Sequence, residues 1–272
     1  MDIATSLFVF YFAAIWGSFL NMLIYRLPLE LSLVRPRSFC PDCKKTIPWF
    51  CNFPLFSYLQ LKGKCHFCKT HIPIRYFLVE LLTSSLGLFL YYLFKFHGWP
   101  KILSLDNLYS QIIIWIMSFA LLCLLIGHFF IDLGHKILPD SLNILLAILL
   151  FLFSLIYSHS LSSILMGGAI GFFFPLSITW IYYQLRGQIG LGGGDIKMWG
   201  AMGLFLGPFF ILENIFLSCA LGSFVALFFM AIKKMNKEDP IPFGPFIIVV
   251  FFLQFLGKIF PHTIFSFSFL GN

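Results

Sequence analysis

Charged residues are scarce in this chain. They make up 11% of its 272 residues, less than half of the roughly 25% that is usual in soluble domains. Hydrophobic residues make up 60% of the sequence, and the mean hydropathy is +0.92. The shortage of charge excludes a soluble globular domain, and the high hydropathy excludes a disordered chain, which needs the opposite composition. We therefore predict an integral membrane protein.

Several common sequence features are missing as well. The chain has no internal repeat, no G-x-G-x-x-G or G-x-x-x-x-G-K-[ST] phosphate motif, and no basic domain with interleaved aromatic residues of the kind that binds nucleic acid. The positive segment of a cleaved signal peptide is also missing, because Asp2 is the only early charge. We therefore predict that the first apolar run is a retained transmembrane helix and that nucleic acid is not a partner.

The sequence contains instead a series of long apolar runs. They lie near residues 4–26, 76–96, 110–131, 141–158, 161–184, 198–212, 214–232 and 243–262. Since about 20 residues cross a bilayer as a helix, the runs predict an all-α polytopic membrane protein with about eight transmembrane helices. Charge, proline and cysteine are dense together only between the first two runs. This divides the chain into a first transmembrane helix (1–27), a polar insert (28–75) and a transmembrane core (76–272).

The distribution of basic residues predicts the orientation in the membrane. Fifteen of the 18 Lys and Arg residues fall in loops on the same side as the insert, and only Lys95, Lys101 and Lys258 fall on the other side. Because cytoplasmic loops carry the excess of Lys and Arg, the insert is predicted to face the cytoplasm. Eight crossings then place both the N-terminus and the C-terminus outside.

The insert contains two C-x2-C pairs in the pattern C-x2-C-x21-C-x2-C, formed by Cys40, Cys43, Cys65 and Cys68. Two thiolates from each tight turn complete a tetrahedral zinc site, and four thiolates leave no open position, so the predicted zinc is structural. A unit of this size needs such a metal, because it is too small to build a sufficient core. Disulfides are less favoured in a reducing cytoplasm. His66 and His71 are the alternative ligands nearby.

Asp132 and Asp195 are candidates for acid–base chemistry. They are 63 residues apart, but the predicted topology places both at the cytoplasmic boundary of the bilayer, where helix packing could bring them together. Ionisable groups at membrane depth are costly and indicate function by default. Two close carboxylates in a site of low dielectric constant cannot both be ionised, so the pair shares a proton. One carboxylate then activates water while the other protonates the peptide carbonyl, as aspartic proteolysis requires.

Three further acidic residues need an interpretation. Asp140, or Ser141 beside it, is well placed as the N-cap of the fourth apolar run. Glu213 is predicted to be a solvated helix start at an external turn. Glu80 lies at the start of the second run and remains a candidate, together with Asp132, Asp140 and Asp195, among the carboxylates at the membrane face, without a specific role.

Five glycines precede or flank Asp195, namely Gly187, Gly190, Gly192, Gly193 and Gly194. Glycine allows positive φ angles and a close approach of backbones. We therefore predict that this segment adopts such conformations and that an extended substrate lies beside it.

These motifs together resemble those of a known family. The residues that carry the resemblance are Gly17–Asn21 and Tyr25–Pro28; Cys40–Cys43, Ser57–Leu59, Gly63–Cys65 and Cys68; Arg75, Tyr76 and Val79–Leu81; Asp132 with Leu138–Asp140; Gly192–Lys197; and Pro242–Phe246. The chain resembles, over nearly its whole length, the bacterial type IV prepilin peptidases, which are membrane aspartic proteases with a G-x-G-D motif.

The resemblance implies an activity and its residues. Asp132 and Asp195 would be the catalytic pair, while Gly192, Gly193, Gly194, Lys197 and Asp140 would shape the site or bind substrate. The implied reaction is removal of short basic leaders from type IV prepilins and type II secretion pseudopilins at the bacterial inner membrane. The family also implies N-methylation of the new N-terminus, with S-adenosylmethionine as the methyl donor, because members with this insert usually methylate. The insert (28–75) would then be associated with the methyltransferase activity.

Two hypotheses from other functional classes remain at this point. An ion-coupled transporter would use the intramembrane carboxylates as a relay, although the chain lacks an inverted repeat. A membrane scaffold without enzymatic activity would use the four-cysteine unit for docking.

Overall fold

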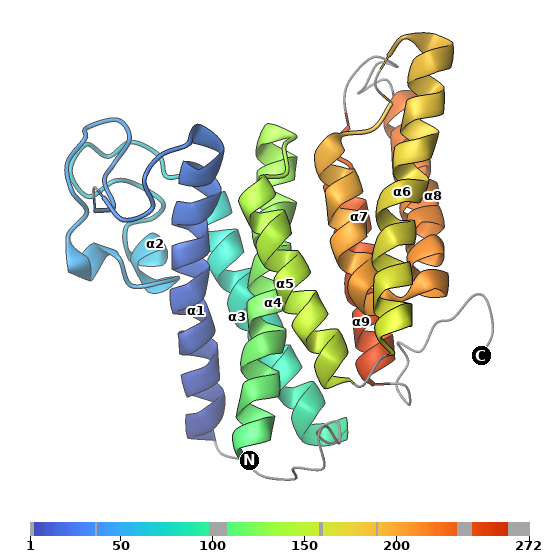
Figure 1. Ribbon diagram of the computed structural model, residues 1–272. Helices are drawn as coiled ribbons and strands as arrows, with labels where there is room; N and C mark the ends of the chain where they lie inside the picture. Colours follow the sequence, from blue (N-terminus) through green and yellow to red (C-terminus); the bar gives the residue numbers. More distant parts are fainter. Residues whose placement is uncertain are drawn as a thin grey trace. The chain divides into compact units, whose positions relative to one another are not determined.

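The computed structural model describes residues 3–35, 37–97, 108–157, 160–188, 190–232 and 241–260. Within them the regular structure is helical (Figure 1), apart from two isolated β-bridges in the insert. The helices are α1 (Ile3–Arg26), α2 (Phe56–Gln60), α3 (Arg75–His97), α4 (Leu108–His135), α5 (Asp140–Ile156), α6 (Leu161–Arg186), α7 (Gly193–Leu206), α8 (Pro208–Ala231) and α9 (Gly244–Ile259), with two short 3₁₀ turns at Leu27–Leu29 and Trp49–Cys51. This confirms the predicted all-α fold, with the insert between the first two long helices.

Among the described residues, five helices are long and apolar enough to cross a membrane, namely α1, α3, α4, α6 and α8. The other three that match predicted runs are shorter, with 17 residues in α5, 14 in α7 and 16 in α9. At about 1.5 Å per residue, these three fall short of the roughly 30 Å hydrocarbon core. The multi-pass membrane protein is therefore supported, while the count of eight crossings stays a prediction.

The chain folds as two compact units. The first comprises residues 1–99 and 111–127, and the second comprises residues 100–110 and 128–272. The four-cysteine insert belongs to the first unit. Asp132 and Asp195 both belong to the second unit, so the two candidate carboxylates lie in one compact body.

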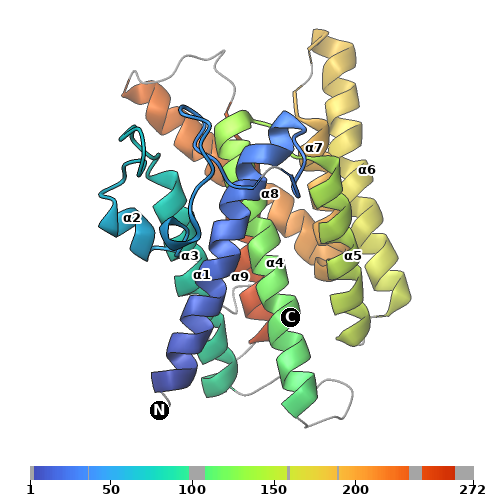
Figure 2. The ribbon, with the colours of Figure 1, turned by 90° about the vertical axis from the view of Figure 1, so that its left-hand side faces the viewer.

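Close packing of α1 against α3 forms the frame of the first unit (Figure 2). A Cβ at Gly17 would lie 2.8 Å from the Cα of Glu80, so the approach of the two backbones requires glycine there. The Asn21 amide donates a hydrogen bond of 2.8 Å to the carbonyl of Tyr76. Small residues and interhelical hydrogen bonds are the usual means of association between membrane helices, and here they fix the start of α3 beside α1.

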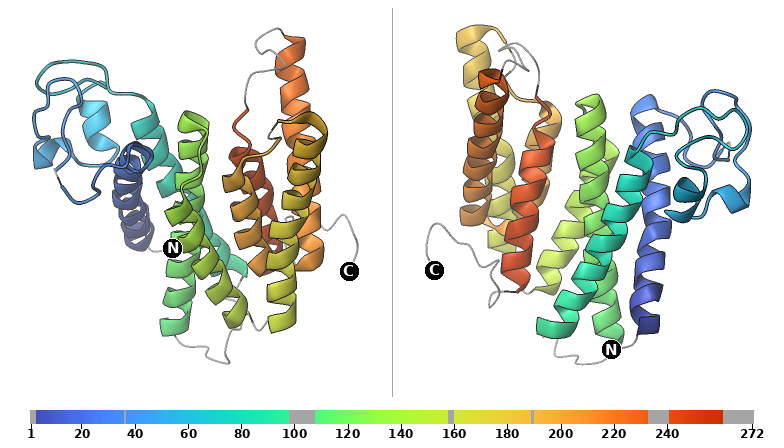
Figure 3. Two further views of the ribbon diagram at one scale, coloured as in Figure 1. Left: turned by 45° about the horizontal axis from the view of Figure 1, so that its top comes forward. Right: turned by 180° about the vertical axis from the view of Figure 1, so that it is seen from behind.

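The second unit is built around α7, which packs against α5 and α6 and also touches α8 and α9 (Figure 3). Gly167 and Gly171 on α6 meet the backbone of α7 so closely that a Cβ at either position would collide with a carbonyl oxygen. Trp199, Phe205, Phe251 and Phe255 fill the space between α7 and α9 and are almost fully buried. This packing holds the first turn of α7, which carries Asp195, in a fixed position.

The boundary between α7 and α8 differs from the sequence prediction. The sixth and seventh apolar runs were predicted to meet near residues 212–214, but the chain turns at Gly207 (φ 81°), and Pro208 starts α8. Glu213 therefore lies inside α8, only 5% exposed, and accepts a hydrogen bond from Gln254. The prediction that Glu213 is a solvated helix start is wrong, because a glycine with positive φ followed by proline breaks the helix six residues earlier.

Candidate active site and metal centre

Asp132 lies in the last two turns of α4 and is 5% exposed. Its Oδ2 accepts a buried hydrogen bond of 2.8 Å from the backbone N–H of Gly244, the first residue of α9. A Cβ on Gly244 would lie 2.9 Å from this same oxygen. The free N–H groups at the start of a helix favour a negative charge. The start of α9 therefore binds the Asp132 carboxylate through a hydrogen bond and close packing.

Asp195 is the third residue of α7 and is largely buried. Its Oδ1 is buried and has no hydrogen-bond partner among the described residues, while Oδ2 lies 3.0 Å from the position of a Cβ on Gly192. A buried polar atom without a partner costs free energy, and such exceptions are an indication of function. One oxygen of Asp195 is therefore available to a water molecule or a substrate.

The two carboxylates act on one another. Asp132 is close enough to Asp195 for Coulombic repulsion between the two carboxylates. Burial makes that repulsion stronger than it would be in water. The fold of the second unit thus brings together two carboxylates that are 63 residues apart in the chain.

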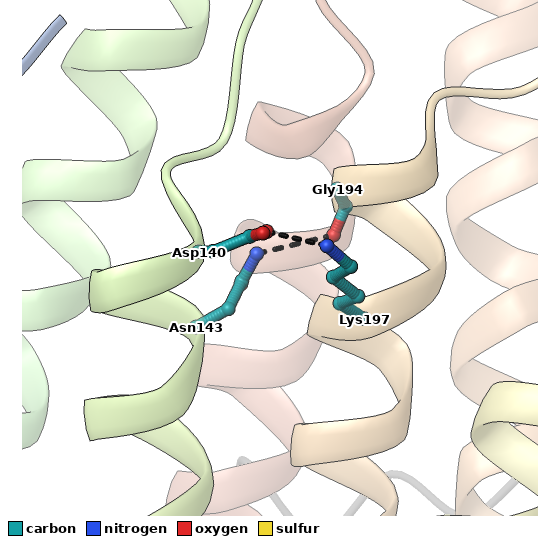
Figure 4. Close-up of polar contacts among 4 residues, drawn as sticks. All are labelled: Asp140, Asn143, Gly194 and Lys197. Atoms are coloured by element: carbon teal, nitrogen blue, oxygen red, sulfur yellow. Dashed lines mark hydrogen bonds and ion pairs between the residues drawn. The ribbon is translucent and has the colours of Figure 1, made fainter.

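Asp140 and Lys197 connect α5 to α7 beside this pair (Figure 4). Lys197 Nζ lies 2.6 Å from Asp140 Oδ1, and Asn143 donates a hydrogen bond of 3.4 Å to the carbonyl of Gly194. The prediction that Asp140 or Ser141 is the N-cap is wrong. Pro139 holds that position without a side-chain cap, and Asp140 is the first helical residue. Asp140 forms an interhelical ion pair instead.

The glycine segment differs in part from the prediction. Among its five glycines only Gly187 has a positive φ, and Gly193 and Gly194 lie in the first turn of α7. Close approach is confirmed at Gly194, where a Cβ would lie 2.7 Å from the Cβ of Leu138. Gly194 therefore allows the segment before α5 and the start of α7 to meet, and the positive φ is found at Gly187.

The two cysteine pairs form turns with the same backbone pattern. In each turn the N–H of the first cysteine donates to the carbonyl five residues later, and the residue four positions later donates back to the carbonyl of that cysteine. The bonds are Cys40 N to Lys45 O (3.0 Å), Lys44 N to Cys40 O (2.9 Å), Cys65 N to Thr70 O (2.8 Å) and Lys69 N to Cys65 O (3.1 Å). Lys44 and Lys69 both have φ 60°. The insert thus contains two turns of equivalent backbone geometry, and these turns carry the four candidate metal ligands.

The four sulfur atoms fit a single metal ion. All four Sγ atoms lie within 4.8 Å of one another, and Cys40 Sγ lies 3.8 Å from Cys68 Sγ. A tetrahedral ion with metal–sulfur bonds of about 2.3 Å would place its ligands about 3.8 Å apart, whereas a disulfide needs about 2.05 Å. All seven cysteines are free. The described His66 and His71 are not part of the cluster, so the alternative of histidine ligands is not supported.

The environments of the four thiols differ. Burial raises the pKa of the Cys40 thiol to about 11. The hydroxyl of Thr70, 3.3 Å from Cys68 Sγ, lowers the pKa of that exposed thiol to about 6. One side of the cluster is therefore closed from solvent, and the other side is open.

Two contacts of the candidate site were not identified from the sequence. The Pro242–Phe246 segment contributes to the family resemblance, but the role of Gly244 as a hydrogen-bond donor to Asp132 depends on a contact across 112 residues. Asn143 lies three residues after Asp140, which is the spacing of one helical face, and this signal could have pointed to it. A role for Gly244 had no comparable local signal.

Comparisons with known proteins agree with the residues of this site. The family model of the bacterial peptidase A24 N-terminal domain matches residues 11–94, and that of the type IV leader peptidase family matches residues 118–227. The chain is 31% identical to the prepilin leader peptidase/N-methyltransferase of Aeromonas hydrophila, over 91% of this chain and 89% of the relative. The corresponding protein of Xanthomonas campestris is 32% identical over 88% and 86% of the two chains.

A relative from Myxococcus xanthus with the same name is 36% identical over 74% of this chain and 56% of its own length. A search of the solved structures gives no significant match. Both family models and the full-length relatives point to the same group of proteins. The chain therefore belongs to the type IV leader peptidase family, together with the prepilin leader peptidase/N-methyltransferases.

Proposed function

We propose that this protein is a membrane aspartic endopeptidase that removes the short basic leader from type IV prepilins and type II secretion pseudopilins, and that it N-methylates the new N-terminus. The observation that carries the proposal is the pair formed by Asp132 and Asp195, which are mostly buried, interact electrostatically and belong to one compact unit. Family membership supports both activities, because the relatives are named for them.

The proposed cleavage uses the two carboxylates in complementary roles. One carboxylate accepts a proton from water as the water oxygen attacks the scissile carbonyl carbon, and the protonated partner gives its proton to the carbonyl oxygen. The tetrahedral intermediate then collapses and the carbon–nitrogen bond breaks. The departing amine takes the proton that the first carboxylate accepted from water, and the partner recovers its proton from the hydroxyl group that becomes the new carboxyl carbonyl. Gly244 holds Asp132 through its N–H, while the Asp195 oxygen without a partner suits contact with water.

We further propose how the protein is oriented in the membrane and which segment of the chain forms the peptidase. The insert and the active site face the cytoplasm, both termini lie outside, and residues 76–272 form the peptidase core. A prepilin would be anchored by its apolar N-terminal helix, so its scissile bond would lie at the bilayer boundary, which is also the position predicted for both aspartates from the distribution of apolar runs and basic residues. The fifteen basic residues on the side of the insert support this orientation.

We propose that the metal of the four-cysteine cluster is zinc with a structural role. The four thiolates would hold it in a closed tetrahedral site, and the ion would link the two turns of the insert.

For the proposed N-methylation, S-adenosylmethionine would supply an electrophilic methyl group. The new amine nitrogen forms a bond to that carbon as the carbon–sulfur bond breaks, the electron pair returns to sulfur, and the nitrogen loses a proton.

The decisive experiment is incubation of the purified protein with a candidate prepilin, followed by mass spectrometry of the product. We expect loss of the leader mass without added donor, and a further gain of one methyl group when S-adenosylmethionine is present. A prepilin of unchanged mass would contradict the peptidase proposal. The transporter hypothesis has no support from the comparisons, since both matching families are peptidase families.

The contact between Gly244 and Asp132 gives a separate prediction. Gly244→Ala places a methyl group 2.9 Å from Asp132 Oδ2, closer than carbon and oxygen normally approach. We expect the carboxylate to shift and the rate of leader cleavage to fall by about tenfold or more, since small misplacements of catalytic groups are costly. Gly134→Ala on α4 is the matched control, because its Cβ meets nothing within 4 Å. Equal rates for the two variants would show that this contact does not position Asp132.

The ion pair between Asp140 and Lys197 gives another prediction. The two side chains are 64% and 46% exposed, so the pair contributes only about 0–1 kcal/mol to stability. Lys197→Met is expected to leave the melting temperature nearly unchanged but to reduce kcat about three- to tenfold, because the start of α7 loses a tie to α5 beside Asp195. The reversed pair Asp140→Lys with Lys197→Asp should recover part of the rate. An unchanged kcat in Lys197→Met would refute the positioning role.

A further inference from the structure

We propose that the methyl donor binds in the cavity of the first unit, between α1, the insert and the start of α3, with Glu80 opposite the sulfonium and Arg75 opposite the carboxylate of the donor. This inference rests on the proposed methyltransferase function and assigns its binding site. Glu80 received no role from the sequence, and the proposed peptidase chemistry does not use it.

The cavity has a volume of about 740 Å³, within the range of roughly 300–1,000 Å³ that is usual for small-molecule sites. Its wall combines one face of α1, the inner side of the four-cysteine insert and the first two turns of α3, which lie next to one another in Figure 2. All of these residues belong to the first unit and to the segment matched by the N-terminal domain of the family. The two aspartates of the peptidase belong to the second unit, so a second reaction has a separate site.

Glu80 provides an anionic group in this wall. It is 8% exposed, and its Oε2 accepts a hydrogen bond of 2.7 Å from the backbone N–H of Leu55. Its other partner is the hydroxyl of Ser18, which also lines the cavity. No basic side chain of the described residues forms an ion pair with it. A buried carboxylate is costly unless it is paired, and a cationic ligand would supply the missing charge.

Arg75 provides the opposite charge. It lies five residues before Glu80 and lines the same cavity, and its Nε is buried without a hydrogen-bond partner. A guanidinium is well suited to bind a carboxylate. The cavity thus presents Glu80 and Arg75 to a ligand, and its wall also contains Arg26, Lys45 and Asp42. S-adenosylmethionine carries a matching sulfonium, together with an amino-acid group that ends in a carboxylate.

Aromatic rings complete the wall. Such rings stack on flat heterocycles and attract onium cations, and the donor contains both an adenine and a sulfonium. The aromatic residues that line the cavity are Phe19, Tyr25, Phe39, Phe53, Tyr58, Phe67 and Tyr76. The aromatic surface and the volume fit the donor, and Glu80, which has no basic ion-pair partner among the described residues, provides a negative group for its sulfonium.

The test measures binding directly, using isothermal titration of the full-length, zinc-loaded protein in detergent with two ligands. S-adenosylmethionine carries the sulfonium charge, and S-adenosylhomocysteine lacks it. Glu80→Gln keeps an acceptor for the Leu55 N–H, so the insert should stay folded. We expect this variant to weaken binding of S-adenosylmethionine by at least about tenfold, the effect of one charged contact, and binding of S-adenosylhomocysteine by less than about threefold.

Arg75→Gln is expected to weaken the binding of both ligands to a similar extent, because both ligands carry the carboxylate. Glu30→Gln, the same change at an exposed position outside the cavity, should leave both affinities unchanged. Zinc content and leader cleavage of each variant report that it is folded. Unchanged binding of S-adenosylmethionine in Glu80→Gln, or an equal loss for both ligands, would overturn the assignment. If the wild-type protein cleaves prepilin but does not bind the donor at all, the methyltransferase proposal fails instead.

Discussion

Replacing either Asp132 or Asp195 by asparagine is expected to abolish leader cleavage, with a fall in rate of at least about a thousandfold. Asparagine has nearly the same shape as aspartate, but it neither accepts a proton from water nor donates one to the carbonyl. The amide oxygen of Asp132→Asn still accepts the hydrogen bond from the Gly244 N–H, so the fold around α9 should persist. Quantitative mass spectrometry of a prepilin substrate over time measures the effect.

Two comparisons make this result specific. Glu30→Gln changes an exposed carboxylate in the same way and should leave cleavage unchanged. The double variant Asp132→Asn with Asp195→Asn should be no slower than either single variant, because groups that act as one unit lose their effect together. Normal cleavage by either single variant would refute the assignment of this pair.

The N-methylation of a peptide that already lacks its leader should survive in both aspartate variants. The two carboxylates lie in the second unit, and the proposed donor cavity lies in the first unit. Loss of both reactions in either variant would indicate a global effect on folding and not a loss of acid–base chemistry.

The sequence predicted the positions of most helices well, because most apolar runs are bounded by polar residues or by proline. The ends of α1, α3, α5 and α6 agree with the predicted runs to within two residues. The boundary between α7 and α8 was misplaced, since the residues on both sides are apolar and hydropathy does not reveal the break. Gly207 and Pro208 were the local signal, and their meaning depends on the positive φ of Gly207.

The four-cysteine cluster was also predictable, because the spacing of cysteines is a local property. The left-handed backbone conformation of Lys44 and Lys69 could not be predicted, since glycine is the usual residue in that conformation. Contacts between distant segments were the hardest to predict. The pairing of Asp140 with Lys197 spans 57 residues, and the local pattern instead suggested an N-cap.

Removal of the metal is expected to unfold the insert. Structural zinc contributes about 10–16 kcal/mol of binding free energy at neutral pH in small zinc-binding domains. The insert has little else to hold it, because its regular structure in the described residues is limited to α2, two 3₁₀ turns and two isolated β-bridges. Cys65→Ser removes a buried ligand. We therefore expect its zinc content to fall from about one ion per chain to nearly zero.

Limited proteolysis reports the unfolding separately from the metal content. The insert contains trypsin sites at Lys44, Lys45, Lys62, Lys64 and Lys69. The metal-loaded turns should resist cleavage there, and Cys65→Ser or chelator-treated protein should be cut rapidly. Cys219→Ser, an exposed cysteine on α8 outside the cluster, is the matched control and should keep both the zinc and the resistance. Protein that is free of metal but remains resistant to trypsin and methylates a processed pilin would contradict a structural zinc, because the thiols alone would then suffice to hold the two turns together.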